Sequence, residues 1–135
     1  MRFIHARLPR ESVTSLYRQT NSLQIRPRQT WLLLTLFYKT VVRSEGPEYI
    51  RDIFTRSADI HHYHTRSRAT SFVPPRARTR AMGGSFQVLA VGAWNALPTT
   101  LYLKPDGGLI STAAFRVKLK QFLTRDEASD GLGLR

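Results

Sequence analysis

The segment Trp31-Leu-Leu-Leu-Thr-Leu-Phe-Tyr38 is the longest apolar stretch of the chain, and the fold depends on it. It lies within a predicted helix from Pro27 to Arg43, whose first turn accepts a proline because its N–H groups have no intrahelical partner. The stretch is apolar on nearly every side, which is typical of a helix that other elements cover. It is far too short to span a bilayer, which takes about 20 apolar residues. We therefore predict that this helix forms the centre of the core.

Weaker patterns surround this central helix. Apolar residues recur at helical spacing in further segments, namely residues 11–23, 47–54, 88–97 and a last segment that Ser111 would cap. A short strand is predicted near Thr70–Val73, and Ser85–Val88 alternates and could pair with it. The sequence thus predicts an α+β, mostly α fold: a small single domain of about four to five helices with a long basic loop and at most a short two-stranded hairpin.

The chain of 135 residues has room for one domain with a single modest core. We expect this domain to cover residues 11–124, with residues 1–10 and 125–135 disordered. The predicted core consists of large apolar residues at the inward positions of the helices: Leu16, Trp31, Leu34, Phe37, Tyr38, Ile50, Phe54, Trp94, Leu97, Phe115, Leu119 and Phe122.

The charge balance is strongly basic. There are 21 Lys and Arg against 9 Asp and Glu, a formal net charge of +12, and 17 of the cations are arginine. Arginine presents a planar fork that binds phosphate oxygens and stacks on bases, so this excess favours a nucleic-acid partner over a general role in solubility. A drifted reading frame with arginine-rich codon usage would give the same composition.

The absence of cysteine excludes disulfides, thiolate zinc sites and cysteine nucleophiles. The start of the chain lacks the apolar run and the small-residue cleavage site of a secretory signal. An intracellular protein without membrane contact is therefore predicted, in the nucleus or the cytoplasm. Oligomeric state is not readable from these patterns.

The best candidate site is the basic run of residues 56–84, where Asp59 is the only acid. Arginines at the alternate positions 76, 78 and 80 would project to one side of an extended strand and match a phosphate track. The predicted residues that bind RNA or DNA are Arg66, Arg68, Arg76, Arg78 and Arg80. The alternative is a solvated loop that only keeps the protein soluble.

No pattern of catalytic residues accompanies this basic run. His61, His62 and His64 lie close together, but a zinc site wants four ligands on a rigid frame, so a solvated histidine-rich loop is favoured. The nine acids are scattered, without the clustered pairs that hold two metal ions in polymerases and nucleases. The sequence predicts no enzyme, no catalytic residue, no metal, no cofactor and no small-molecule substrate.

One compact motif, Trp94-Asn-Ala-Leu-Pro98, stands apart from the charges. Trp94 lies at helical spacing from Leu89 and Leu97, which favours a place in the core over an exposed ring that stacks on a base. Asn95 is expected to bind free backbone groups at the end of its helix. Trp94, Asn95, Leu97 and Pro98 are therefore predicted to be structural.

Seven segments form an ordered series over residues 12–124. They are Leu32-Leu-Leu-Thr-Leu-Phe-Tyr-Lys39, Gly46-Pro-Glu-Tyr-Ile-Arg-Asp-Ile-Phe54, His61-His-Tyr-His-Thr-Arg-Ser67, Pro75-Arg-Ala-Arg-Thr79, Ser85-Phe-Gln-Val88, Gly92-Ala-Trp-Asn-Ala-Leu-Pro98 and Phe115-Arg-Val-Lys-Leu-Lys-Gln-Phe-Leu123. In order and spacing, this series resembles the C-terminal region of LINE-type (non-LTR, jockey-like) retrotransposon reverse transcriptases. Two features depart from that pattern: Arg116 stands where the family usually has lysine, and the loop of residues 101–111 is longer.

The resemblance implies a non-catalytic C-terminal fragment of an RNA-directed DNA polymerase from a mobile element. Neither the paired aspartates of a polymerase palm nor an endonuclease is present in the sequence. In the parent proteins, this region follows the polymerase and is expected to help hold template RNA or target DNA. Two alternatives remain open: a protein-interaction or docking domain whose arginine loop is incidental, and a decayed remnant with no selected function.

Overall fold

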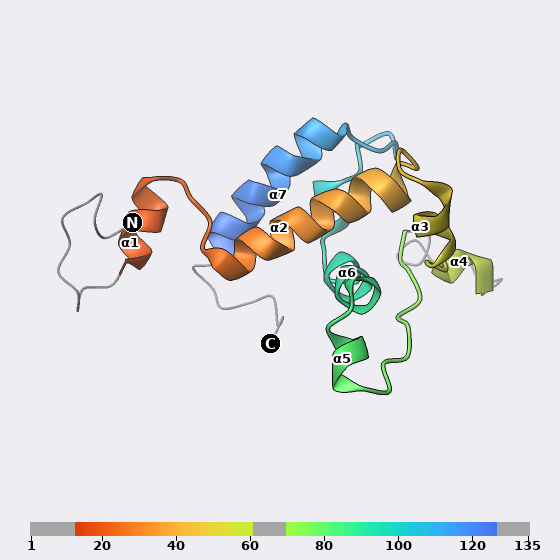
Figure 1. The fold of residues 1–135 in the computed structure, drawn as a ribbon. Helices are drawn as coiled ribbons and strands as arrows, with labels where there is room; N and C mark the ends of the chain where they lie inside the picture. The colour runs from red at the N-terminus through yellow and green to blue at the C-terminus, as the bar shows by residue number, and fades with distance from the viewer. Residues whose placement is uncertain (1–12, 61–69, 127–135) are drawn as a thin grey trace.

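The computed structural model describes residues 13–60 and 70–126, and in this part the chain is mostly helical (Figure 1). Its elements are α1 (Thr14–Gln19), α2 (Ile25–Phe37), the π-helix η1 (Tyr38–Val42), α3 (Glu48–Asp52), α4 (Ser57–Ile60), α5 (Arg80–Gly83), α6 (Phe86–Asn95), the 3-10 helix η2 (Thr99–Leu101) and α7 (Thr112–Asp126). The predicted small, mostly helical domain is confirmed. The predicted number of helices is not, because the described residues also form one-turn helices such as α4 and α5. The predicted disorder of residues 1–10 concerns residues outside the described part, as does that of residues 127–135.

Helix α2 and the π-helix η1 form one continuous rod at the centre of the molecule, close to the predicted helix of Pro27–Arg43. Helix α7 runs beside α2, and α6 packs across it (Figure 1). The Trp31 indole N–H donates to the Arg116 carbonyl oxygen at 3.0 Å. The Arg116 guanidinium in turn lies 4.9 Å from the centre of the Trp31 ring. These contacts fix α2 against α7 near the rim of the core.

The expectation that other elements cover α2 on every side is wrong. Leu32 is 54% exposed and Leu36 is 50% exposed, whereas Leu34 and Phe37 on the opposite face are fully buried. Only two helices, α6 and α7, pack closely against the rod. A chain of this length buries a smaller fraction of its surface than a larger domain does, so a central helix keeps one face in water.

The core is a cluster of aromatic rings around the end of α2. Tyr38 stacks on Phe115 with ring centres 4.2 Å apart, and Trp94 lies 4.5 Å from Tyr102. Nine of the twelve predicted core residues are buried: Leu16, Leu34, Phe37, Tyr38, Phe54, Trp94, Leu97, Phe115 and Leu119. The other three, Trp31, Ile50 and Phe122, are partly buried and pack against the cluster. The prediction of the core is thus largely confirmed, although Leu16 is buried outside this cluster.

The predicted hairpin between residues 70–73 and 85–88 does not form. Ser85 is the N-cap of α6, and its hydroxyl accepts a hydrogen bond from the Val88 N–H. Residues 86–88 are therefore the first turn of a helix, because the capping serine outweighs the short alternation. Phe72 pairs instead with Arg56 in an isolated antiparallel bridge.

The rod ends in a tight C-terminal cap. The Arg43 N–H donates to the Tyr38 carbonyl oxygen at 2.9 Å, and the Glu45 N–H donates to the Lys39 carbonyl oxygen at 3.0 Å. Between them Ser44 has a φ of 57°, in the left-handed region where glycine is usual. Gly46 follows, and a Cβ there would lie 2.7 Å from the Thr40 side chain. The chain can therefore double back closely over η1 only with glycine at position 46.

We predict that Ser44→Gly raises the free energy of unfolding by about 0.5–1 kcal/mol. A left-handed conformation costs a residue with a Cβ about 1–2 kcal/mol, and the greater freedom of glycine in the unfolded chain offsets part of the gain. Urea denaturation followed by circular dichroism measures the change. Ser44→Ala is the control, since it removes the hydroxyl but keeps the strained backbone. Equal stability of the glycine and alanine variants would contradict the prediction.

Candidate nucleic-acid interface

The structure separates the predicted phosphate-binding arginines into two groups. Arg76 and Arg78 are exposed on the extended segment of residues 73–78, and Arg80 is exposed as the first residue of α5. The alternation expected of an extended strand therefore applies to Arg76 and Arg78 only, because a helix begins at Arg80. Residues 66 and 68 lie outside the described part, as do the histidines at 61, 62 and 64. We call residues 73–80 the arginine segment.

The start of the arginine segment is fixed by the two residues at the end of α6. The Trp94 indole N–H donates to the Thr70 carbonyl oxygen at 2.9 Å. The Asn95 side chain accepts from the Phe72 N–H at 3.0 Å and donates to the Phe72 carbonyl oxygen at 2.8 Å. The amide thus pairs with Phe72 as a neighbouring strand would. Trp94 is a core residue, as predicted, but the expected role of Asn95 is wrong: it binds a distant segment and not its own helix end.

The other end of the arginine segment is also fixed. The Thr79 hydroxyl caps α5 by accepting from the Met82 N–H at 3.1 Å, and α5 packs on α6. Leu97 is buried just after α6, and Pro98 is the N-cap of η2. Helix α6 and its flanks therefore support the segment at both ends.

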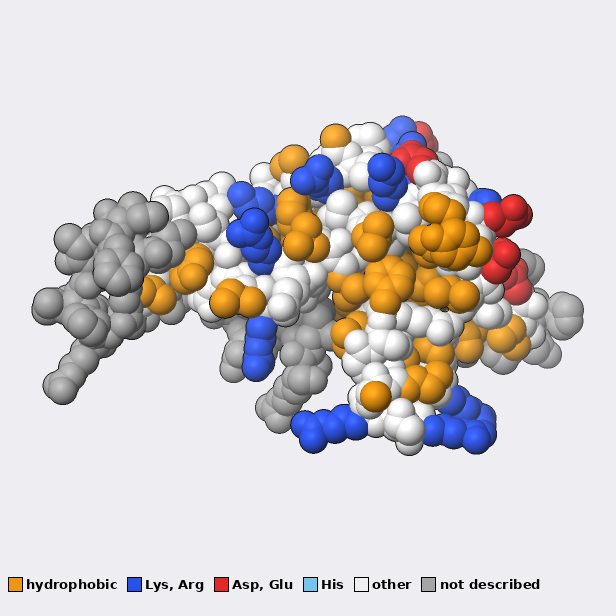
Figure 2. Space-filling model, in the orientation of Figure 1, with side chains coloured by type: hydrophobic (Ala, Val, Ile, Leu, Met, Phe, Trp, Pro, Cys, Tyr) orange, Lys and Arg blue, Asp and Glu red, His pale blue; other side chains and the backbone are white. Residues whose placement is uncertain are grey.

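The charges of the molecule are unevenly distributed. In Figure 2, Lys and Arg side chains project on both sides of the end that α5 forms, while Asp and Glu gather near α3. The sequence contains no acid between Asp59 and Asp106. Within residues 13–60 and 70–126, no carboxylate forms an ion pair with Arg76, Arg78 or Arg80, whereas Arg43 pairs with Glu45 at 2.6 Å. The arginine segment therefore presents unneutralised guanidinium groups to solvent.

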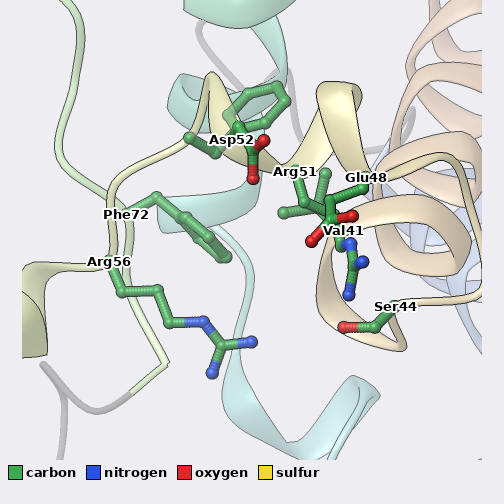
Figure 3. Close-up of a pocket in the computed structure, with 8 residues that line it drawn as sticks. Val41, Ser44, Glu48, Arg51, Asp52, Arg56 and Phe72 are labelled. Atoms are coloured by element: carbon green, nitrogen blue, oxygen red, sulfur yellow. The ribbon is translucent and has the colours of Figure 1, made fainter.

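A cavity of about 320 Å³ lies beside the start of the segment (Figure 3). Its lining comes from η1, α3 and the bridge between Arg56 and Phe72: Val41, Ser44, Glu48, Arg51, Asp52, Phe54, Arg56 and Phe72. The Nε of Arg51 is buried there and has no hydrogen-bond partner among the described residues. Sequence reasoning did not single out Arg51, because only the fold brings it next to Arg56 and Phe72.

A second polar cluster has a structural role. The Tyr38 hydroxyl donates to the Ile110 carbonyl oxygen at 2.6 Å, and Arg43 donates to the same oxygen at 2.8 Å. Burial raises the pKa of Tyr38, and the hydrogen bond with Arg43 lowers it in part. The phenol thus keeps its proton for this bond, which ties the start of α7 to η1.

Metal ligands and membrane spans were sought within the described residues. In this part of the chain, no group of three or more His, Asp or Glu side chains is placed to hold a metal ion. No helix in it has the length and apolar character to cross a membrane.

No protein-family model, curated protein or solved structure matches the chain. A functional assignment therefore depends on the chemistry of the site. The resemblance to reverse-transcriptase tails stays a prediction.

Proposed function

We propose that the chain is a non-catalytic nucleic-acid-binding module, a fragment from the C-terminal region of a LINE-type reverse transcriptase. Its arginine segment binds the phosphate backbone of RNA or DNA. The observation that carries the proposal is the placement of Arg76, Arg78 and Arg80: all three are exposed, and none forms an ion pair with a described acid.

The anchoring of the segment supports this function. Trp94 and Asn95 fix its start, and Thr79 fixes its end. Less conformational freedom is lost on binding when the binding groups are held on a segment with fixed ends. Alternate residues of an extended chain lie about 6.6 Å apart, a spacing similar to that of successive phosphates on an extended single strand. Arg76 and Arg78 are therefore suited to neighbouring phosphates.

The docking domain is a second candidate function, and one observation favours it. Ile25, Leu32 and Leu36 are exposed and fall on one face of α2. An apolar stripe on a helix is a usual docking surface for another helix. Such a partner would contact α2, whereas nucleic acid would contact the arginine segment, so variants of the two surfaces distinguish these functions.

Salt dependence tests the nucleic-acid proposal. If three to five phosphates of a single strand are neutralised, the logarithm of affinity falls with the logarithm of salt concentration with a slope of about −2 to −4. Fluorescence anisotropy of a labelled single-stranded RNA, titrated with the full chain at 50–300 mM KCl (roughly the range in which such slopes are measured), gives this slope. A duplex DNA of equal length compares the two kinds of partner. A flat dependence would exclude phosphate binding as the main interaction.

A further inference from the structure

The cavity beside the arginine segment has polar groups that the fold itself does not use. Its apolar wall consists of Val41, Phe54 and Phe72, which are buried. With about 320 Å³, it lies at the small end of the volumes that hold small ligands. One nucleotide is a ligand of this size.

One side of the cavity is cationic. In Figure 3 the guanidinium groups of Arg51 and Arg56 and the hydroxyl of Ser44 lie toward the same part of the cavity. The Arg56 guanidinium is held 5.9 Å from the centre of the Phe72 ring. Neither arginine forms an ion pair with a described residue, and the buried Nε of Arg51 lacks an acceptor. Two arginine forks and a hydroxyl are a donor set that suits a phosphate.

The other side is acidic. Glu48 and Asp52 lie one turn apart on α3, and Figure 3 places their carboxylates away from Arg56 and Ser44. No described residue forms an ion pair with either carboxylate. A carboxylate repels phosphate but accepts hydrogen bonds from the exocyclic amino group of a base, as from N4 of cytosine. The cavity therefore suits a ligand with an anionic end and an amino group at a distance from it.

A nucleotide has both groups, with the sugar between them. A free α-amino acid also carries both charges, but only one carbon atom separates them, so it does not reach both sides at once. The position in the fold favours the nucleotide further, since the arginine segment begins directly after Phe72, a wall of the cavity. A strand bound along the arginine segment can continue into the cavity.

We infer that this cavity binds one nucleotide of the bound strand, with its phosphate at Arg51, Arg56 and Ser44 and the amino group of its base at Glu48 and Asp52. The inference builds on the proposed function, because it assigns a preference for bases with an exocyclic amino group to the same interface. Arg51 and Arg56 are the phosphate ligands, and the carboxylates on α3 select the base.

Mononucleotides test the inference with the full chain. Isothermal titration with CMP, UMP, cytidine and inorganic phosphate compares ligands that have both groups, one of them, or neither sugar nor base. We expect CMP to bind about 10-fold more tightly than UMP, since one well-placed hydrogen-bonded pair to a base gives discrimination of this order. Cytidine and inorganic phosphate should each bind at least as weakly as UMP. Equal affinity for CMP and UMP, or preferential binding of phenylalanine, would overturn the inference.

Three variants assign the effect to its residues. R51Q/R56Q should lose CMP binding, and E48Q/D52N should keep phosphate binding but lose the preference for CMP over UMP. R76Q/R78Q/R80Q is the matched control, which should bind CMP like the original chain but single-stranded RNA more weakly. RNA binding without CMP binding would overturn the nucleotide cavity and leave the proposed function in place. CMP binding without RNA binding would do the opposite. Circular dichroism confirms that each variant is folded.

Discussion

Replacing Trp94 with alanine is expected to lower the free energy of unfolding by about 3–5 kcal/mol, which is much of the 5–15 kcal/mol typical of a whole domain. The Trp94 side chain is only 2% exposed, so its removal leaves a large cavity that the surrounding rings cannot fill. Four aromatic rings contact it, with ring centres 4.5–6.2 Å away: Phe37, Tyr38, Tyr102 and Phe115. Urea denaturation monitored by far-ultraviolet circular dichroism measures this loss.

Trp31→Ala is the matched control for this substitution. Trp31 also donates its indole N–H to a backbone carbonyl, but its side chain is partly exposed at the rim of the core. Its loss should therefore cost about 1–2 kcal/mol less than the loss of Trp94. Trp94→Phe isolates the hydrogen bond to Thr70, because it keeps an aromatic ring in the core. Equal destabilisation by Trp31→Ala and Trp94→Ala would contradict the placement of Trp94 at the centre of the fold.

Replacing Arg76, Arg78 and Arg80 together with glutamine is expected to weaken binding to single-stranded RNA by about 100-fold at low salt. Each lost phosphate contact also removes about 0.7–1 unit from the slope of the salt dependence, so the slope should become shallower by about 2–3 units. The three side chains are exposed, and the anchors of the segment at Trp94 and Asn95 are unchanged. The measurement is fluorescence anisotropy with the same RNA.

A control of equal charge separates a local interface from a general attraction. Lys104, Lys118 and Arg125 are also exposed, on the loop before α7 and on α7 itself. Replacing these three with glutamine removes the same net charge, so it should weaken binding far less if the arginine segment is the interface. Equal weakening by both triple variants would show that the net charge of +12, and not this segment, causes binding.

The parts of the fold that were predicted from the sequence are those with local signals. The rod of α2 and η1, and helices α6 and α7, each carry apolar residues at helical spacing. The buried residues Phe72, Tyr102 and Ile110 were missed, because they lie outside the longer helices, where no periodicity marks the inward face. Their burial follows from long-range contacts, such as the hydrogen bond between the Tyr102 and Thr70 hydroxyls at 2.9 Å.

The candidate site shows the same division. The exposed arginines 76, 78 and 80 follow from their spacing in a segment without acids. The partner of Asn95 lies 23 residues earlier in the chain, and no local pattern indicates it. The cavity needs Arg51, Arg56 and Phe72 at one place, which only the antiparallel bridge produces. Sequence patterns therefore indicated the phosphate-binding chemistry but not the geometry next to it.

The π-helix makes the length of the chain as important here as its composition. In η1 the Arg43 N–H reaches back five residues to Tyr38, one more than in an α-helix. Deleting a single residue from this turn would let an α-helix continue, but it would rotate everything that follows by about 100° around the rod. Ser44 and α3 would then leave their places at the cavity. Over evolutionary time, this turn should accept substitutions more readily than insertions or deletions.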